Sequence, residues 1–529
     1  MCAIIGYVGK YYKIEELKES LDKTISRGPD KQAYITKNDL FLGFNRLSIM
    51  DLSDDGMQPF ENGSDYLVCN GEIYNFNKYK KELIKDGYHF HSNSDCEVLL
   101  PLYKKYGVDF VKLLDAEFAF ILYDSVTNEL IAGRDPIGIR PLFYGYDKNN
   151  KIIFASEPKM LIPLSKKIYN FPPAHIYYNG KFIRYDDVTN VANFNNKSTN
   201  EITSNIKKLL IAGVTKRLAS DAKVGFLLSG GLDSSLVCAI ASKHYKEQIT
   251  TFSIGLDNGA VDLKYARIVA SYLNTKHYEF TFSVDDVINN LSNLIYVLGT
   301  YDITTIRASI GMYLLCKKIH ENTDIKVLLT GEISDELFGY KYTDYAPNGE
   351  EFQKESKKRL DELHYYDVLR ADRCISANSL EARVPFGDLE FVRYVMAISP
   401  EIKLNKYGIG KYLLRKAFDD NTYLPSNILN REKEAFSDGV GHLMVDKIKE
   451  YAEKKYTDSQ FLILKDKYKE PFGPISKESL LYREIFESFY PNNACLIPSY
   501  WMPNTSWEGL KDANDPSARI LSNYGKSGD

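Results

Sequence analysis

The chain has 529 residues, with 67 Lys and Arg against 71 Asp and Glu and a formal net charge of −4 at pH 7. This balance excludes a general attraction to nucleic acid or to anionic membranes, and the 44% hydrophobic and 26% charged residues are ordinary for a soluble protein with two or more domains. Seven scattered cysteines form no C-x-x-C pair, which argues against a disulfide framework and a zinc site. We find no signal-peptide pattern and no tract that could form a membrane helix, so we expect a cytoplasmic protein.

Residues 2–185 are predicted to form a mainly β domain. Short apolar or aromatic runs are separated by Gly, Asn, Asp and Pro turns, at residues 3–8, 40–44, 66–69, 119–123 and 152–155. Helical patterns occupy residues 77–85 and 95–105. Strands with few intervening helices favour antiparallel sheets layered with helices, an α+β arrangement of the αββα type.

Residues 200–490 are predicted to form an α/β domain after a linker rich in Asn, Ser and Thr at 188–203. Apolar residues recur every four positions from Ile202 to Leu218 and predict an amphipathic helix. Strand and helix patterns then alternate over residues 224–228, 236–244, 251–255 and 262–273, with a further strand at 326–330. This alternation predicts a doubly wound parallel sheet with extra helices, and ligands at the carboxyl ends of its strands. Residues 491–529 are predicted to be an irregular tail, partly disordered.

The most informative motif is Ser-Gly-Gly-Leu-Asp-Ser-Ser at residues 229–235, between an apolar run and a helix that we expect to begin near Ser235. Backbone N–H groups at such a turn hold phosphate, and Asp233 offers a carboxylate for Mg²⁺. A glycine turn that serves only geometry is the alternative interpretation. The motif resembles the pyrophosphate loop of ATP pyrophosphatases, which cleave ATP between the α and β phosphates.

Cys2 becomes the first residue once Met1 is removed, and it then carries both a thiol nucleophile and an α-amine. Because the free amine titrates at about 8, it can act as a local base for the thiol. A buried structural cysteine at the start of a strand is the alternative.

Four further residues among the first 100 suggest a site for a free amino acid. Asn70 and Gly71 offer the donors of an oxyanion hole, Arg46 could clamp a carboxylate, and Asp95 could pair with an ammonium. Taken singly, such an Arg is more often a surface cation, and such an Asp is more often a helix cap. Together they would hold an α-amino acid with its side-chain amide facing Cys2.

Ordered motifs over nearly the whole chain, to about residue 490, resemble the glutamine-hydrolysing asparagine synthetases. Those at residues 1–6, 27–30, 46–49, 70–75, 94–97 and 133–135 resemble class II glutamine amidotransferase domains, whose nucleophile is an N-terminal cysteine. The others are at residues 229–235, 300–309, 381–386 and 433–441.

The resemblance implies roles for individual residues. Cys2 would be the nucleophile, with Asn70 and Gly71 as the oxyanion hole. The implied glutamine site comprises Arg46, Leu47, Ser48, Ile49, Met50, Asn70, Gly71, Glu72 and Asp95. The implied ATP site comprises Leu228, Ser229, Gly230, Gly231, Leu232, Asp233, Ser234, Ser235, Ile254, Thr330 and Gly331. Mg²⁺ would bind Asp233 and Asp335, aspartate would bind Thr304, Thr305 and Arg307, and Glu332 and Lys433 would act in the synthetase chemistry.

The implied reaction is synthesis of L-asparagine from L-aspartate, glutamine and ATP through β-aspartyl-AMP, with ammonia passing between two sites in a homodimeric enzyme. Three residues depart from the family: Ser26 stands where His is common, and Ile333 and Tyr340 stand where glycine is usual. Ile333 would be strained if its position needs a positive φ. A relative that acts on another carboxylate is one alternative, against which the retained Cys2, Asn70 and Asp95 argue. A non-catalytic relative is the other, against which the retained Asp233, Glu332, Asp335 and Lys433 argue.

Overall fold

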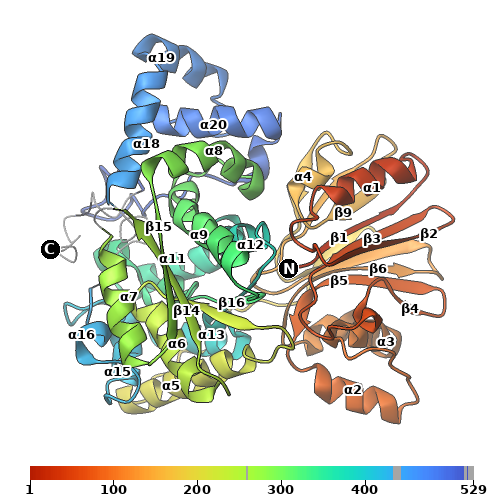
Figure 1. The fold of residues 1–529 in the computed structure, drawn as a ribbon, viewed down its shortest axis with the longest axis horizontal. Helices are drawn as coiled ribbons and strands as arrows, with labels where there is room; N and C mark the ends of the chain where they lie inside the picture. Colours follow the sequence, from red (N-terminus) through yellow and green to blue (C-terminus); the bar gives the residue numbers. More distant parts are fainter. Residues whose placement is uncertain (258–259, 433–441, 517–520, 522–529) are drawn as a thin grey trace.

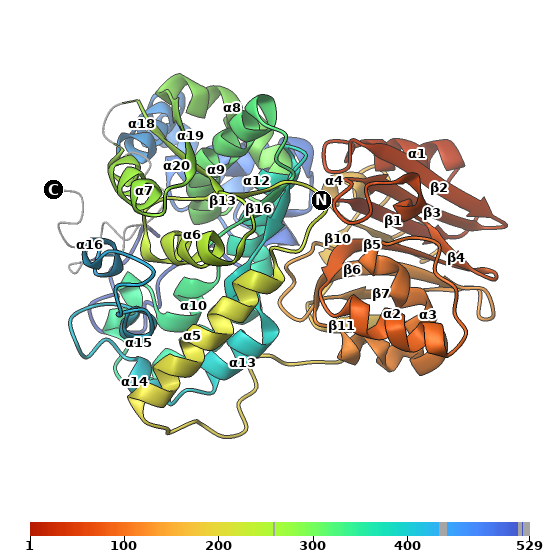
Figure 2. The same cartoon turned by 60° about the horizontal axis from the view of Figure 1, so that its bottom comes forward.

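The computed structural model describes residues 1–257, 260–432, 442–516 and 521, and divides into two halves (Figure 1). The first half consists mainly of β-sheet, and the second surrounds a parallel sheet with helices. The N-terminus lies where the two halves meet (Figures 1 and 2). Within the described residues no helix is both long and apolar enough to cross a bilayer.

Two six-stranded sheets form the first half. The first contains β1 (Ala3–Val8), β2 (Lys31–Lys37), β3 (Leu40–Arg46), β8 (Phe143–Tyr146), β9 (Ile152–Ala155) and β10 (Ile168–Asn170), in the order β10-β8-β9-β1-β3-β2. The second contains β4 (Phe60–Asn62), β5 (Asp65–Ile73), β6 (Ala116–Asp124), β7 (Glu129–Arg134), β11 (His175–Tyr178) and β12 (Lys181–Arg184), in the order β12-β11-β7-β6-β5-β4.

Helices cover the outer face of each of these sheets. Because side chains alternate along a strand, Ile4 of β1 packs between the sheets with Ile121, whereas Ile5 packs outward with Leu21 of α1 (Ile14–Asp22). The first sheet is also covered by α4 (Pro158–Leu161), and the second by α2 (Phe76–Lys85) and α3 (Leu99–Tyr106). Single 3₁₀ turns lie at η1 (Asp54–Gly56), η2 (Asp95–Val98) and η3 (Gly107–Leu113). The predicted αββα class is therefore confirmed.

The second half is built on a five-stranded parallel sheet, as predicted. Its strands are β13 (Val224–Leu227), β14 (Thr250–Leu256), β15 (Lys276–Phe282), β16 (Val327–Leu329) and β17 (Glu381–Arg383), in the order β15-β14-β13-β16-β17. The chain moves outward from β13 through β14 to β15, and later adds β16 and β17 on the other side of β13. The strand order therefore changes direction between β13 and β16, which is where open α/β sheets bind ligands.

Helices pack on both faces of this sheet. Leu329 of β16 packs in one core with α5 (Thr199–Lys216) and α6 (Leu232–His244), and the adjacent Leu328 packs in the other with α8 (Val284–Leu298), α9 (Ile303–Asn322) and α12 (Asp367–Ser376). The second core is continuous with the first half, because it also contains Ile5, Leu17 and Leu21.

The remaining elements of the second half are helices and single turns. They are α7 (Val261–Tyr272), α10 (Ser334–Phe338), η4 (Lys341–Tyr345), α11 (Gly349–Glu362), η5 (Leu363–Tyr365), η6 (Pro385–Gly387), α13 (Leu389–Met396), α14 (Pro400–Lys403), α15 (Tyr412–Ala417), α16 (Ser426–Leu429), α18 (His442–Lys455), α19 (Asp458–Lys467), α20 (Lys477–Phe489) and η7 (Ala494–Leu496). In the described residues after 490, η7 is the single helical turn, and Trp507 and Leu510 pack against Tyr342.

Three sequence predictions differ from the structure. Helix α6 begins at Leu232, three residues earlier than expected, which puts Asp233 and Ser234 in its first turn. The predicted linker ends inside α5, because Ser198 and Glu201 cap each other and start that helix at Thr199. The predictions also missed two of the parallel strands, β15 and β17.

Candidate functional site

Cys2 lies directly before β1, and residues of both halves of the molecule contact this part of the chain. The backbone N–H of Leu47 points to its Sγ at 3.5 Å, and Nε of Arg27 donates to its carbonyl oxygen at 3.0 Å. Arg27 is fully buried and is itself bound by Asp372 of α12, at 2.8 and 3.0 Å. Burial raises the pKa of the Cys2 thiol to about 11. The thiol is therefore protonated at neutral pH until a base is placed beside it.

Met1 occupies the position next to this thiol in the full chain. Its side chain is buried, and its ammonium donates to the carbonyl of Leu380 at 3.1 Å, in the second half. Burial lowers the pKa of this ammonium to about 5. While Met1 is present, the nitrogen of Cys2 is a peptide nitrogen and cannot serve as a base.

Strand β5 carries the predicted oxyanion-hole residues. Asn70 is 1% exposed, and among the described residues its Nδ2 has no hydrogen-bond partner. A Cβ at Gly71 would lie 2.8 Å from the carbonyl oxygen of Glu117, so the close strand pairing requires glycine there. An orphaned buried donor is rare in proteins, and it indicates a ligand acceptor at this position.

The predicted charged residues of the glutamine site are all nearly buried. Arg46 is 4% exposed, and its guanidinium donates to the carbonyl of Ser53 at 2.6 Å and to that of Asp51. Asp95 starts η2 and accepts from the backbone N–H of Ile73 at 2.6 Å. Burial raises the pKa of Asp95 to about 6.

The segment that follows β3 supplies the other predicted members of this site. Leu47 and Ile49 are buried, and Ser48 and Met50 are partly buried. The N–H of Ser48 donates to the carboxylate of Asp30 at 2.8 Å. Glu72, next to Gly71 on β5, is paired with Arg383 of the second half at 3.0 Å. The predicted glutamine-site residues thus all lie on β3, on β5 or on segments next to these strands.

The second predicted site is a cavity of about 240 Å³ at the carboxyl ends of β13 and β16. The predicted residues that line it are Leu228, Ser229, Gly231, Leu232, Asp233, Ser234, Ile254, Thr304, Arg307, Thr330, Gly331, Glu332 and Asp335. Hydroxyls of Thr304 and Thr330 are buried there without a hydrogen-bond partner among the described residues. Unpartnered polar groups on a cavity wall indicate a polar ligand.

Three residues predicted for this site do not line the cavity. Gly230 has φ +74°, and a Cβ there would lie 2.5 Å from the backbone of Ala266, so its role is to form the turn. Ser235 is fully buried within α6. Thr305 donates twice to Asp302 at 2.8 Å, and so it belongs to the N-cap of α9.

The two predicted metal-binding carboxylates meet at one ammonium. Nζ of Lys411 lies 2.8 Å from both oxygens of Asp233, 2.7 Å from Asp335 and 3.0 Å from the hydroxyl of Ser334. Across the parts of the chain that the structure describes, no group of three or more His, Cys, Asp or Glu side chains is arranged to hold a metal. A cation at this point would therefore take its remaining ligands from phosphate or water.

Two other charged residues of the cavity are held by ion pairs. Glu332 pairs with Arg370 of α12 at 2.7 Å, and Arg370 also pairs with Asp367. Arg307 binds Glu478 at 2.6 and 2.8 Å, and Asp515 of the C-terminal segment at 2.8 and 3.0 Å. The arginine that the resemblance implies for aspartate binding is thus paired with carboxylates of the chain itself.

Comparison with known proteins covers both halves. A family model described as "Glutamine amidotransferase domain" matches residues 1–204, and one described as "Asparagine synthase" matches residues 205–354 and 344–512. Proteins named glutamine-hydrolysing asparagine synthetase include one from Zea mays (39% identical over 99% of this chain and 94% of that protein) and one from Arabidopsis thaliana (41%, 98% and 94%). A protein of Acanthamoeba polyphaga mimivirus, named a probable enzyme of this kind, is 40% identical over 98% of this chain and its own full length. This chain belongs to the glutamine-hydrolysing asparagine synthetase family.

Ile333 and Tyr340, for which the family resemblance implies glycine, differ in their backbone conformation. Ile333 has φ +80°, so a β-branched residue occupies the left-handed region. It is 2% exposed and packs against Gly387. Tyr340 has φ −119°, and Gly339 before it carries the positive φ, so a side chain at 340 causes no backbone strain.

The family motif at residues 433–441, and with it Lys433, lies outside the described residues. The sequence predictions missed Lys411 and Arg370. Lys411 follows Gly408 and Gly410 and has φ +59°. A glycine-rich segment before a lysine was the available signal, but nothing in the sequence pairs it with Asp233.

Proposed function

We infer that this chain synthesises L-asparagine from L-aspartate, glutamine and ATP, and releases glutamate, AMP and diphosphate. Full-length similarity to glutamine-hydrolysing asparagine synthetases supports the overall reaction. The observation that carries the residue roles is that one chain has a cysteine at position 2, an orphaned buried amide donor on β5 and a cavity lined by the glycine turn of residues 229–234.

The thiol of Cys2 attacks the side-chain amide carbon of glutamine. Its proton passes to the α-amine of Cys2, which becomes available when Met1 is removed. Nδ2 of Asn70 and the N–H of Gly71 stabilise the oxyanion, and this lowers the barrier because these donors are already in place. The protonated α-amine returns this proton to the amide nitrogen, which leaves as ammonia, and water then hydrolyses the thioester to glutamate.

Opposite charges hold the two charged groups on the α-carbon of glutamine in this proposal. Arg46 binds the α-carboxylate, and Asp95 and Glu72 bind the α-ammonium. Leu47, Ser48, Ile49 and Met50 form the adjoining wall. Because Asp95 and Glu72 are buried, the ammonium of glutamine adds positive charge beside these carboxylates, of which Glu72 is already paired with Arg383.

In the second cavity the β-carboxylate of aspartate attacks the α-phosphorus of ATP, and diphosphate leaves. Backbone N–H groups of residues 229–234, the N-terminus of α6 and Lys411 receive the negative charge of the leaving group. Asp233 and Asp335 converge in a way that fits Mg²⁺, which would neutralise phosphate charge there. Glu332 and Lys433 are proposed for formation and amination of the adenylate.

Aspartate is proposed to bind at Arg307 with Thr304. Arg307 keeps Glu478 as a partner, so Asp515 is the carboxylate that leaves when aspartate arrives. Thr305 supports this end of α9 through its cap. Ammonia is proposed to reach the adenylate through the protein, because free ammonia is mostly protonated in neutral water.

We further propose a cytoplasmic homodimer with an amidotransferase domain at 2–185, a synthetase domain at 200–490 and a tail at 491–529. Sedimentation of the purified chain tests the dimer, and fluorescence microscopy of a tagged chain tests the compartment.

One assay tests the reaction itself. Purified protein is given glutamine, aspartate and Mg-ATP, and asparagine, AMP and diphosphate are quantified together. We expect equal amounts of the three products. AMP and diphosphate without asparagine would contradict the proposal and indicate a different carboxylate substrate.

A further inference from the structure

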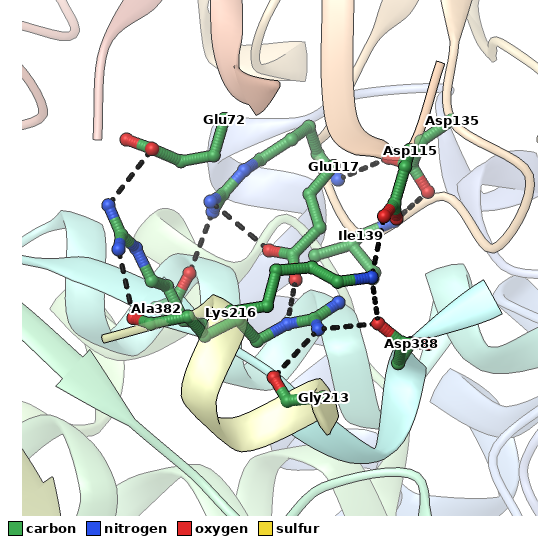
Figure 3. Close-up of polar contacts among 12 residues, drawn as sticks. Glu72, Asp115, Glu117, Asp135, Ile139, Gly213, Lys216, Ala382 and Asp388 are labelled. Carbon is green, nitrogen blue, oxygen red and sulfur yellow. Dashed lines mark hydrogen bonds and ion pairs between the residues drawn. The ribbon is translucent and has the colours of Figure 1, made fainter. Parts of the chain in front are cut away.

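Two buried glutamates lie side by side where the halves meet, Glu72 on β5 and Glu117 on β6, at paired positions of the two strands (Figure 3). They are 5% and 1% exposed. Side chains at paired positions of antiparallel strands share one face of the sheet, so the two carboxylates would repel each other without cations. Each receives an arginine from the second half: Glu72 pairs with Arg383 at 3.0 Å, and Glu117 pairs with Arg217 at 2.8 Å.

Arg383 is held rigidly from its own side of the interface. It lies on β17, the edge strand of the parallel sheet, and is fully buried. Its Nε donates to Glu381 at 3.0 Å, and its Nη1 donates to the carbonyl of Arg217 at 2.9 Å and to that of Ala219. These contacts leave Nη2 directed at Glu72. A guanidinium fixed in this way determines where the opposing carboxylate can lie.

The charges around Glu72 make Arg383 its main partner. Glu381 of β17 and Asp95 of η2 face it with negative charge, and Arg140 adds a weaker positive influence than Arg383. Burial raises the pKa of Glu72 well above its usual value, and Arg383 is the strongest opposing influence. Arg383 therefore opposes the effect of burial on Glu72 more than any other residue does, and the 3.0 Å ion pair fixes where the carboxylate lies.

We propose that Arg383 is a positioning residue of the glutamine site, which holds the Glu72 carboxylate in place and directed at the α-ammonium of glutamine. This inference rests on the proposed function, which places Glu72 in that site. Its consequence is that the glutamine site is incomplete in the N-terminal half alone, because β17 of the synthetase half orients one of its carboxylates.

The test compares Arg383→Lys with Arg217→Lys, because both arginines form buried pairs across the same interface. Lysine keeps the charge but lacks the planar fork that reaches several acceptors at once. We expect Arg383→Lys to raise KM for glutamine about tenfold, because lysine cannot keep a cation at the position from which Nη2 of Arg383 pairs with Glu72 at 3.0 Å. Ammonia-dependent asparagine synthesis should stay within about twofold of wild type. Arg217→Lys should leave KM for glutamine unchanged, since its partner is Glu117.

The pH profile separates positioning from general support of the fold. Burial already raises the pKa of Glu72, and it rises further in Arg383→Met, so the fall in KM for glutamine with rising pH should lie at higher pH in the variant than in wild type. Should Arg383→Met fail to fold, the double variant Glu72→Gln with Arg383→Met removes both charges, and Arg383→Met should raise KM far less in that background.

Three results would overturn the inference. They are an equal loss of glutamine-dependent and ammonia-dependent synthesis in Arg383→Lys, an unchanged KM for glutamine, and full additivity of the Glu72 and Arg383 substitutions. A wild-type chain that makes no asparagine from glutamine would instead refute the proposed function, so the two failures are distinguishable.

Discussion

Nζ of Lys411 lies 2.8 Å from both side-chain oxygens of Asp233. The same ammonium contacts Asp335, so one lysine neutralises the two carboxylates proposed for Mg²⁺. The Lys411 ammonium therefore occupies the position where a metal would bind. When Mg-ATP enters, Lys411 has to move away or lie beside the metal.

Replacing Lys411 with Met should separate metal binding from catalysis. Without the ammonium, Asp233 and Asp335 should bind Mn²⁺ in the absence of nucleotide, which electron paramagnetic resonance would detect. Diphosphate release should fall at least about 100-fold, because a cation that stabilises the leaving group is lost. Glutaminase activity is the internal control. Normal diphosphate release would remove Lys411 from the mechanism.

Cys2→Ala should abolish use of glutamine and leave ammonia-dependent synthesis intact. The thiol is the proposed nucleophile of the first site, whereas the second cavity does not include it. Product formation with ammonium chloride, compared with product formation with glutamine, checks this. Loss of both activities would refute the division of the chemistry into two sites.

Asn70→Ala should lower kcat for glutamine hydrolysis by about 100- to 1,000-fold, with a much smaller effect on KM. Nδ2 of Asn70 is buried and has no hydrogen-bond partner in the described residues, so removing this nitrogen costs the free enzyme no hydrogen bond. Steady-state glutaminase kinetics measure this. An unchanged kcat would show that the oxyanion is stabilised elsewhere.

Asp515→Asn should lower KM for aspartate about two- to tenfold, because the charged competitor at Arg307 is removed. KM for glutamine should not change. The exposed Asp512 provides a matched control on the same segment, since Asp512→Asn preserves Asp515. A higher KM for aspartate in Asp515→Asn would mean that Asp515 supports the substrate site.

A glycine variant is usually less stable than an alanine variant, and we expect the opposite order of stability at position 333. Both remove the buried side chain, but at φ +80° only glycine relieves the backbone strain. Ile333→Gly should therefore be more stable than Ile333→Ala by about 1 kcal/mol. Urea unfolding of the two variants measures the difference. A more stable alanine variant would show that this backbone relaxes without glycine.

Local patterns were enough to predict the strands β1 and β9 and the phosphate loop. Each of these depends on neighbouring residues: an apolar run, or a glycine turn between a strand and a helix. Charged contacts across the fold could not be predicted in this way. Lys411 contacts Asp233 although 178 positions separate them in the sequence, and no pattern near either residue predicts this contact.

Strand β17 shows the same limit for secondary structure. Two of its three residues, Glu381 and Arg383, are charged, so it carries no apolar alternation that would predict a strand. This charged strand can be buried because Arg383 forms ion pairs with Glu72 and Glu381. Asp515 was missed for a related reason, since an irregular segment gives no pattern that predicts where its side chains dock.

The hydrophobic core that runs from Leu17 and Leu21 of α1 to the helices α8 and α9 belongs to neither half alone. Cutting the chain between the halves would leave apolar faces on both pieces in contact with water. Heating should therefore melt the protein in one cooperative transition. The chain is better regarded as a single folding unit than as two enzymes joined by a linker.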